Sequence, residues 1–368
     1  MLLAWAEEVS TATEILHGDS LAILREMKSD LVDCVVTSPP YWGLRDYGTG
    51  RWEGGDADCE HSHSGQVQDN KAPGAISSGM RPGADASSCR KCGALRIDSQ
   101  MGLEPTVGEH VAAMVVLFRE VRRVLKPNGT LWLNYGDSYA TSINGRSAAD
   151  TKAAGNDDRT FRDKPFSTVG GVLKPKDLCG VPWRVALALQ EDGWWLRQDI
   201  IWAKPNPMPE SIRDRCTKSH EYIFLMTKSE RYYFDFEAIK EPVAAATQAR
   251  LNQNVADQVG SDRAHKGGAG KTNGTMKAVG AVDLRNRRSV WNVPTAAFSG
   301  AHYATFPPAL IEPCILAGCP VGGVVLDPFL GSGTVGMVAN KHGRNCIGIE
   351  LNAESVDLAR TRIDEAAA

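Results

Sequence analysis

The chain has 368 residues, a formal net charge of −3 and nine cysteines. This length allows one large core or two smaller ones, and the near-neutral charge means that any contact with nucleic acid must come from a local patch. No apolar run approaches a membrane span, residues 1–8 lack the features of a signal sequence, and the cysteines do not indicate a disulfide scaffold, so we expect a cytoplasmic protein without a membrane partner.

The first predicted elements are a short strand over residues 13–17 and a helix that ends near Met27. Asp19 immediately precedes the helix, and its carboxylate is expected to cap the helix amino terminus.

A buried strand is predicted over residues 32–36, and it stops at Thr37-Ser38-Pro39-Pro40-Tyr41. Two prolines cannot donate backbone hydrogen bonds, so they form a rigid corner that presents carbonyl acceptors. Open α/β sheets place their ligands beyond the carboxyl ends of strands. Acceptors beside an aromatic ring suit a planar base with an exocyclic amino group; the alternative is an ordinary strand ended by prolines.

Residues 49–100 are rich in Gly, Ser and Asp, and a segment of this kind inside a compact domain needs a stabilising cross-link, such as a bound metal ion. The pair Cys89 and Cys92 has the spacing of a zinc knuckle, and Cys59 with His61, or with nearby His63, could complete a tetrahedral site. The alternative is a set of free surface thiols.

Helical spacing continues over residues 107–126, followed by a predicted turn at 127–129 and a buried strand at 130–134. Residues 134–139 follow that strand and are assigned to a pocket wall. Residues 140–176 are polar and lack an apolar period, which predicts a mobile loop.

Order returns with a predicted helix over 181–189 and strands over 193–204 and 221–227. Trp202 and Lys204 could face a bound base, although an aromatic residue on a strand more often belongs to the core. Residues 243–290 carry eight Lys or Arg against three Asp, so they could neutralise phosphates or form a solvated linker.

Near the carboxyl end, an apolar strand over 322–327 runs into a glycine-rich turn and then a helix over 334–341. Glycines allow a ligand to approach the backbone closely, while amides at the helix start point toward its polar groups. The next strand ends at Glu350, a place from which a carboxylate can accept both hydroxyls of a ribose. A generic dinucleotide site is the alternative.

Two motifs support a resemblance to a known family. Residues 38–41 resemble the S-P-P-Y motif of the DNA amino-methyltransferases, which methylate cytosine N4 or adenine N6, and residues 327–334 resemble their D-P-F-x-G-x-G-T motif. The motif order is that of the beta group. The resemblance covers residues 13–48, 107–139, 181–240 and 300–366, and it implies an α/β fold: a Rossmann-like, doubly wound, mostly parallel sheet of the class I methyltransferase type in permuted order, with a Cys/His insertion and mobile DNA-recognition insertions.

The resemblance also implies functional residues. Catalysis is assigned to Ser38, Pro39, Pro40 and Tyr41. Binding of S-adenosylmethionine is assigned to Asp19, Phe306, Pro307, Asp327, Pro328, Phe329, Gly331, Ser332, Gly333, Thr334 and Glu350. A structural zinc on Cys59, His61, Cys89 and Cys92 is consistent with Cys/His insertions in similar sequences.

We therefore expect five segments: a catalytic half over 1–48, the Cys/His insertion over 49–100, the catalytic half continued over 101–240, a basic target-recognition segment over 241–299, and a cofactor half over 300–368. Duplex DNA is the expected substrate, with a restriction endonuclease as a companion and a monomer or homodimer as the assembly. Serine before Pro-Pro-Tyr favours cytosine N4, with adenine N6 as the alternative. A methyltransferase for RNA or another substrate, and a non-catalytic zinc module that binds DNA, are the rival functions.

Overall fold

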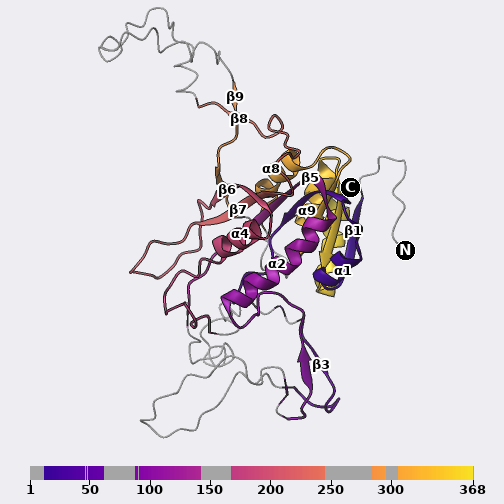
Figure 1. Ribbon diagram of the computed structural model, residues 1–368, viewed down its shortest axis with the longest axis vertical. Coiled ribbons are helices and arrows are strands. Elements are labelled where there is room, and N and C mark those ends of the chain that lie inside the picture. The colour runs from indigo at the N-terminus through magenta and orange to yellow at the C-terminus, as the bar shows by residue number, and fades with distance from the viewer. Residues whose placement is uncertain are drawn as a thin grey trace, which may run out of the picture.

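A computed structural model describes residues 12–45, 47, 49–61, 88, 89, 91–141, 167–244, 283–295 and 306–367 (Figure 1). The helices are α1 (Ser20–Glu26), α2 (Val107–Val124), α4 (Val181–Glu191), α8 (Pro308–Gly318), α9 (Thr334–Lys341) and α10 (Ala353–Ala367). The strands are β1 (Thr13–His17), β2 (Val32–Thr37), β3 (Arg51–Glu53), β4 (Leu95–Ile97), β5 (Leu125–Tyr135), β6 (Trp195–Ala203), β7 (His220–Thr227), β8 (Glu241–Pro242), β9 (Leu284–Arg285), β10 (Val290–Asn292), β11 (Val324–Asp327) and β12 (Asn345–Glu350).

Eight strands form the main sheet in the order β1-β12-β11-β2-β5-β7-β6-β10. Within this sheet only β7 runs against its neighbours, which confirms the predicted mostly parallel α/β fold. Strands β2 and β11 are parallel neighbours. Both predicted motifs therefore leave the sheet at the same edge, although about 290 residues separate them in the sequence.

Helices cover both faces of the sheet because side chains alternate along each buried strand. On one face, Val35, Leu131 and Leu133 pack in the core that includes residues of α1, α2 and α4. On the other face, Cys34 and Trp132 pack in the core that includes residues of α8 and α9. The fold is therefore doubly wound. Strand β1 pairs with β12, so the amino-terminal residues complete the half of the sheet that carries the glycine-rich turn.

The predicted turn at residues 127–129 is instead part of β5. Strand β2 pairs Val32 with Leu125 but Cys34 with Thr130, so residues 126–129 bulge out of register within the strand. An ion pair between Lys126 and Asp33 holds the bulge against β2. The turn-forming residues 127–129 therefore form a bulge within β5 instead of a separate turn.

The structure describes only the ends of the two segments that were predicted to be mobile or basic. Residues 142–166 and 245–282 lie outside the described residues. However, Thr168 donates to the Thr141 carbonyl and Lys176 to the Ala140 carbonyl, so the described end of the first segment is bound to the residues that follow β5. In the second segment, Arg285 and Arg288 both pair with Glu241 across the small β8–β9 sheet, so these cations already have a partner.

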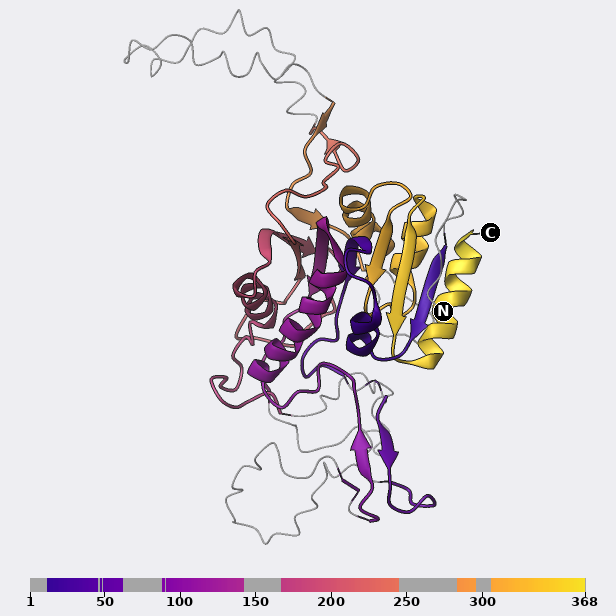
Figure 2. The ribbon, with the colours of Figure 1, turned by 45° about the vertical axis from the view of Figure 1, so that its right-hand side comes forward.

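The predicted Cys/His insertion contributes the hairpin β3–β4, which lies below the main sheet in Figure 2. No helix in the described part of the chain is long and apolar enough to cross a membrane.

Candidate active site

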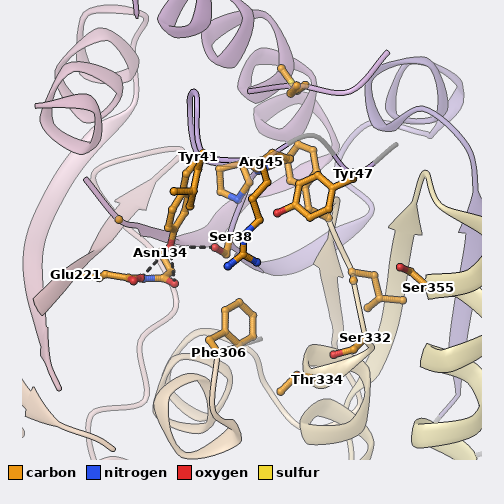
Figure 3. A pocket seen from close by; sticks show the side chains of 18 of the residues that line it. Ser38, Tyr41, Arg45, Tyr47, Asn134, Glu221, Phe306, Ser332, Thr334 and Ser355 are labelled. Carbon is orange, nitrogen blue, oxygen red and sulfur yellow. Dashed lines mark hydrogen bonds between the residues drawn. The ribbon is translucent and has the colours of Figure 1, made fainter. Parts of the chain in front are cut away.

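A cavity of about 1540 Å³ opens at the edge of the sheet where β2, β5, β11 and β12 end. Figure 3 shows Ser38, Tyr41, Asn134 and Glu221 grouped on one side, with Phe306 and Thr334 across from them. Of the predicted site residues, those that line the cavity are Asp19, Ser38, Pro39, Pro40, Tyr41, Phe306, Pro328, Phe329, Gly331, Ser332, Thr334 and Glu350. The two motifs thus share one space.

The hydroxyl of Ser38 is oriented so that its lone pairs are available to accept hydrogen bonds. Its hydroxyl donates to the Tyr41 oxygen at 3.3 Å, and the Tyr41 hydroxyl donates to Glu221 at 2.8 Å. A hydroxyl has one proton and two lone pairs, so a Ser38 that donates to Tyr41 keeps its lone pairs for another donor. Burial, together with the nearby Glu221 charge, raises the pKa of Tyr41 well above its ordinary value, which keeps the phenol neutral.

The Tyr41 ring lies in a tight aromatic setting. It stacks on Tyr135 with ring centres 5.1 Å apart and an angle of 19° between the planes. A side chain at Gly136 would bring its Cβ within 2.5 Å of the Tyr41 ring, so glycine is required there. Tyr135 therefore covers one face of the Tyr41 ring.

Strands β6 and β7 add a charged pair to the cavity wall. Lys204 forms an ion pair with Glu221, and its ammonium lies 4.2 Å from the centre of the Trp202 ring. Trp202 is only 4% exposed and donates its indole N–H to the Val293 carbonyl at 2.7 Å. Trp202 therefore belongs to the core, the more common setting for an aromatic residue on a strand, and it also lines the cavity.

The glycine-rich turn fits a cofactor that carries a ribose. Gly331 and Gly333 have φ values of 54° and 83°, in the left-handed region that favours glycine. Glu350 accepts hydrogen bonds from the Gly331 amide at 2.9 Å and the Asn352 amide at 2.8 Å, and the residue lines the cavity. Burial raises the pKa of Glu350. Asp19 lines the same cavity while capping α1, as expected.

Three predicted cofactor residues do not line the cavity. Asp327 is 1% exposed and accepts hydrogen bonds from the Thr37 hydroxyl at 2.7 Å and the Phe329 amide at 3.0 Å. It joins the end of β2 to the turn after β11. Pro307 occupies the position just before α8, and Gly333 is packed so closely that a Cβ there would lie 3.0 Å from Ala359. These three residues support the segments that line the cavity but do not line it themselves.

Several lining residues had no signal in the sequence. Gln100 donates to the Arg45 carbonyl at 2.9 Å and accepts from the Tyr47 amide at 2.7 Å, so the end of the insertion holds the loop after the proline corner. Ser20 donates to the Pro328 carbonyl at 2.6 Å. Others, missed for the same reason, are Met101, Met208, Ile212, Asn352, Glu354, Ser355 and Leu358. Each depends on segments that meet only in three dimensions.

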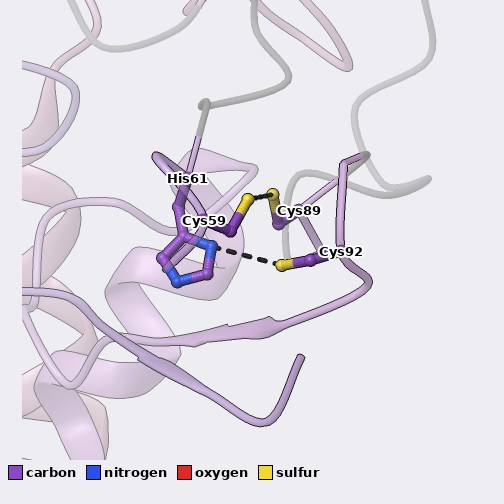
Figure 4. A group of neighbouring side chains, drawn as sticks. All are labelled: Cys59, His61, Cys89 and Cys92. Carbon is purple, nitrogen blue, oxygen red and sulfur yellow. Dashed lines mark hydrogen bonds between the residues drawn. The ribbon is translucent and has the colours of Figure 1, made fainter. Parts of the chain in front are cut away.

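The four predicted metal ligands come together in the insertion (Figure 4). Their ligand atoms all lie within 4.8 Å of one another, with 3.9 Å between the sulfurs of Cys59 and Cys89 and 3.4 Å from the Cys92 sulfur to His61 Nδ1. Tetrahedral zinc with bonds of about 2.3 Å to sulfur separates two thiolates by about 3.8 Å, so the set fits zinc. The alternative ligand His63 lies outside the described residues.

Comparison with known proteins identifies the family. Residues 32–361 match the N6/N4 methyltransferase family model, which is described as DNA methylase. The chain belongs to this family. It is an S-adenosylmethionine-dependent DNA methyltransferase, as the resemblance of its two motifs predicted.

Similar proteins cover nearly the whole chain. The type II methyltransferase M.Cfr9I of Citrobacter freundii is 42% identical over 356 residues, which is 97% of this chain and 89% of that protein. M.SmaI of Serratia marcescens is 41% identical over 350 residues, 95% and 90% of the two chains. Among solved structures, PvuII DNA methyltransferase (cytosine-N4-specific) has a TM-score of 0.55 at 16% identity and covers 97% of this chain and 91% of its own. That structural likeness shows the class I methyltransferase fold.

Proposed function

We propose that this methyltransferase transfers a methyl group to the exocyclic amino group of a base extruded from duplex DNA, with cytosine N4 as the target. The single observation that carries the proposal is the shared cavity, in which the acceptor corner at Ser38 and the turn around Gly331 face one space. S-adenosylmethionine supplies a methyl group on a sulfonium, and the remaining work falls to residues of the chain.

Ser38 and the Pro39 carbonyl would accept hydrogen bonds from the two protons of the amino group. Conjugation makes that nitrogen a poor nucleophile, so holding its lone pair in line with the methyl group must supply much of the acceleration. The hydrogen bond from Ser38 to Tyr41 supports this role because it directs the serine proton away from the amino group. No covalent intermediate with the enzyme is required.

Extruding a base costs a few kcal/mol, and stacking on an aromatic ring offsets roughly 1–3 kcal/mol of that cost. Tyr41 would provide the stacking face. Glu350 would accept the ribose hydroxyls of the cofactor, with Asp19, Phe306 and the turn around Gly331 forming the rest of its site.

We infer the target base from the identity of the residue before Pro-Pro-Tyr, which is Ser38. Members of the family that methylate adenine more often carry Asp or Asn before Pro-Pro-Tyr, so serine favours cytosine N4, and adenine N6 is the alternative. Sequencing DNA from cells that express the protein, with detection of modified bases, identifies the base and the recognition sequence together. N6-methyladenine would overturn the choice of cytosine. Labelled methyl transfer to RNA or protein but never to DNA would overturn the proposal.

The role of Ser38 has its own test. Changing Ser38→Ala should slow methyl transfer about 10²-fold, because one of two positioning acceptors is lost, while the Kd of S-adenosylmethionine stays nearly unchanged. Single-turnover rates and isothermal titration calorimetry measure the two quantities. A loss of cofactor binding as large as the loss of rate would contradict this role.

We also infer a structural zinc on Cys59, His61, Cys89 and Cys92, supported by the ligand spacing. The type II names of the relatives support a companion restriction endonuclease with the same recognition sequence. A monomer or homodimer is the expected assembly, which mass photometry would measure.

A further inference from the structure

An exposed apolar rim borders the cavity on the loop between β6 and β7. Met208 is 65% exposed and Ile212 is 40% exposed, yet both side chains line the cavity, beside Pro207 and Pro209. Strand β6 ends, and β7 begins, at the same edge of the sheet as β2 and β5, so this loop lies beside the place where a target base would enter. Large apolar side chains left in water next to a binding cavity mark a surface that a partner covers.

Several contacts hold the rim in place. Pro205, Pro207 and Pro209 restrict the backbone. Asn206 exchanges two hydrogen bonds with Thr295, accepting from its amide at 2.9 Å and donating to its carbonyl at 3.3 Å. A rim that is already held in shape loses less conformational entropy when it enters an interface.

The second half of the loop is tied down through Glu210. This carboxylate accepts from the Arg215 guanidinium at 2.8 Å and from the Lys218 amide at 3.1 Å. Arg213 is exposed next to Ile212, and Lys218 lines the cavity. The loop that carries the apolar side chains therefore has four cations (Lys204, Arg213, Arg215 and Lys218) against two carboxylates (Glu210 and Asp214), a combination that suits a base stack flanked by phosphates.

We propose that Met208, supported by Ile212, inserts into the duplex at the position that the extruded base leaves. The inference rests on the proposed extrusion of the target base and deepens it by naming the residue that fills the gap. An extruded base leaves a gap in the stack, and apolar side chains such as Met and Ile commonly occupy such gaps in protein–DNA complexes. Met208 keeps the gap filled while the base occupies the cavity near Ser38.

The test uses the full-length enzyme and a duplex that contains its recognition sequence. With Met208→Ala, we expect catalytic efficiency on a fully paired duplex to fall about tenfold, because the open gap favours return of the base to the stack. The fluorescence increase of a paired duplex that carries a fluorescent cytosine analogue, able to pair with guanine, at the target position should shrink in parallel. On a duplex with a mismatch opposite the target base, where extrusion is easier, the defect should shrink to about twofold or less.

Matched variants separate this role from a general loss of structure. Met208→Leu should keep near wild-type behaviour, and Ile212→Ala should show a smaller defect of the same kind. Val321→Ala is the control, because Val321 is 73% exposed but precedes β11 at the opposite edge of the sheet. The inference is overturned if Met208→Ala behaves like Val321→Ala, or if it loses as much activity on the mismatched duplex as on the paired one while still binding S-adenosylmethionine. A wild-type enzyme that methylates no DNA would instead refute the proposed function.

Discussion

Among single residues, Thr37 and Asp327 link the two motifs directly through a hydrogen bond. Their hydrogen bond is buried and joins the carboxyl ends of β2 and β11. Ser38 directly follows Thr37, and Pro328 directly follows Asp327. The bond therefore sets the distance between the acceptor corner and the cofactor turn without touching either ligand.

Changing Thr37→Val should remove the donor while keeping the shape of the side chain. We expect kcat for methyl transfer to fall about 10- to 100-fold because the reacting groups lose alignment, with little change in the Kd of S-adenosylmethionine. Thr37→Ser should restore the rate because it keeps the hydroxyl. Stopped-flow kinetics with cofactor titrations would check this, and an equal loss of rate in Thr37→Ser would show that the hydroxyl is not the cause.

Asp327 should also make stability depend on pH. Burial raises its pKa from 3.8 to about 7, so the folded protein binds this proton more tightly than the unfolded chain does. The contribution is favourable at low pH and is lost as the pH rises toward 7. Relative to Asp327→Asn, the wild type should therefore lose unfolding free energy between pH 4 and pH 7, measured by urea denaturation at each pH. Parallel pH profiles for the two proteins would contradict this assignment.

Among the elements, the hairpin β3–β4 links the Cys/His cluster to the cavity. Its two strands pair with each other and flank the cluster in the sequence, and Trp52 of β3 stacks on His61 with ring centres 4.8 Å apart. Gln100, just after β4, contacts Arg45 and Tyr47 near the proline corner. The insertion thus supports one wall of the active-site cavity.

Metal removal should act on this element first. Purified protein should contain about one zinc per chain, and Cys92→Ser should lose it. Hydrogen exchange should then rise in β3 and β4, while protection in β11 and β12 stays unchanged because those strands belong to the main sheet. Inductively coupled plasma mass spectrometry and hydrogen-exchange mass spectrometry measure these effects. Equal exchange in the variant and the wild type would show that no metal supports the hairpin.

At the scale of the whole molecule, the strand order of the sheet brings the two motifs together although their order along the chain is permuted. Strand β2 comes early in the sequence and β11 late, yet they are parallel neighbours. Ligands of an open α/β sheet gather at the carboxyl ends of its strands, so the chain order of the motifs has no effect on their distance. Strand β1 reinforces this arrangement because it pairs with β12 from the other end of the chain.

Local chemistry made much of this architecture readable from the sequence. The α9 helix begins at Thr334 as predicted, and α2 begins at Val107, because apolar periods, caps, prolines and glycines act within a few residues. The proline corner and the glycine turn were recognised for the same reason. Cys59, His61, Cys89 and Cys92 also meet as predicted, since metal ligands follow recurrent spacings.

Only the tertiary structure decided the contacts of Glu221 and Asp327. Glu221 meets Tyr41 across 180 residues, and Asp327 meets Thr37 across 290. Such contacts depend on which strands become neighbours in the sheet, and that order depends on packing of both faces rather than on any local pattern. The sequence alone therefore determined which elements form and which chemistry they carry. The folded sheet decided which side chains touch, because contacts between distant segments arise only when the strands are placed side by side.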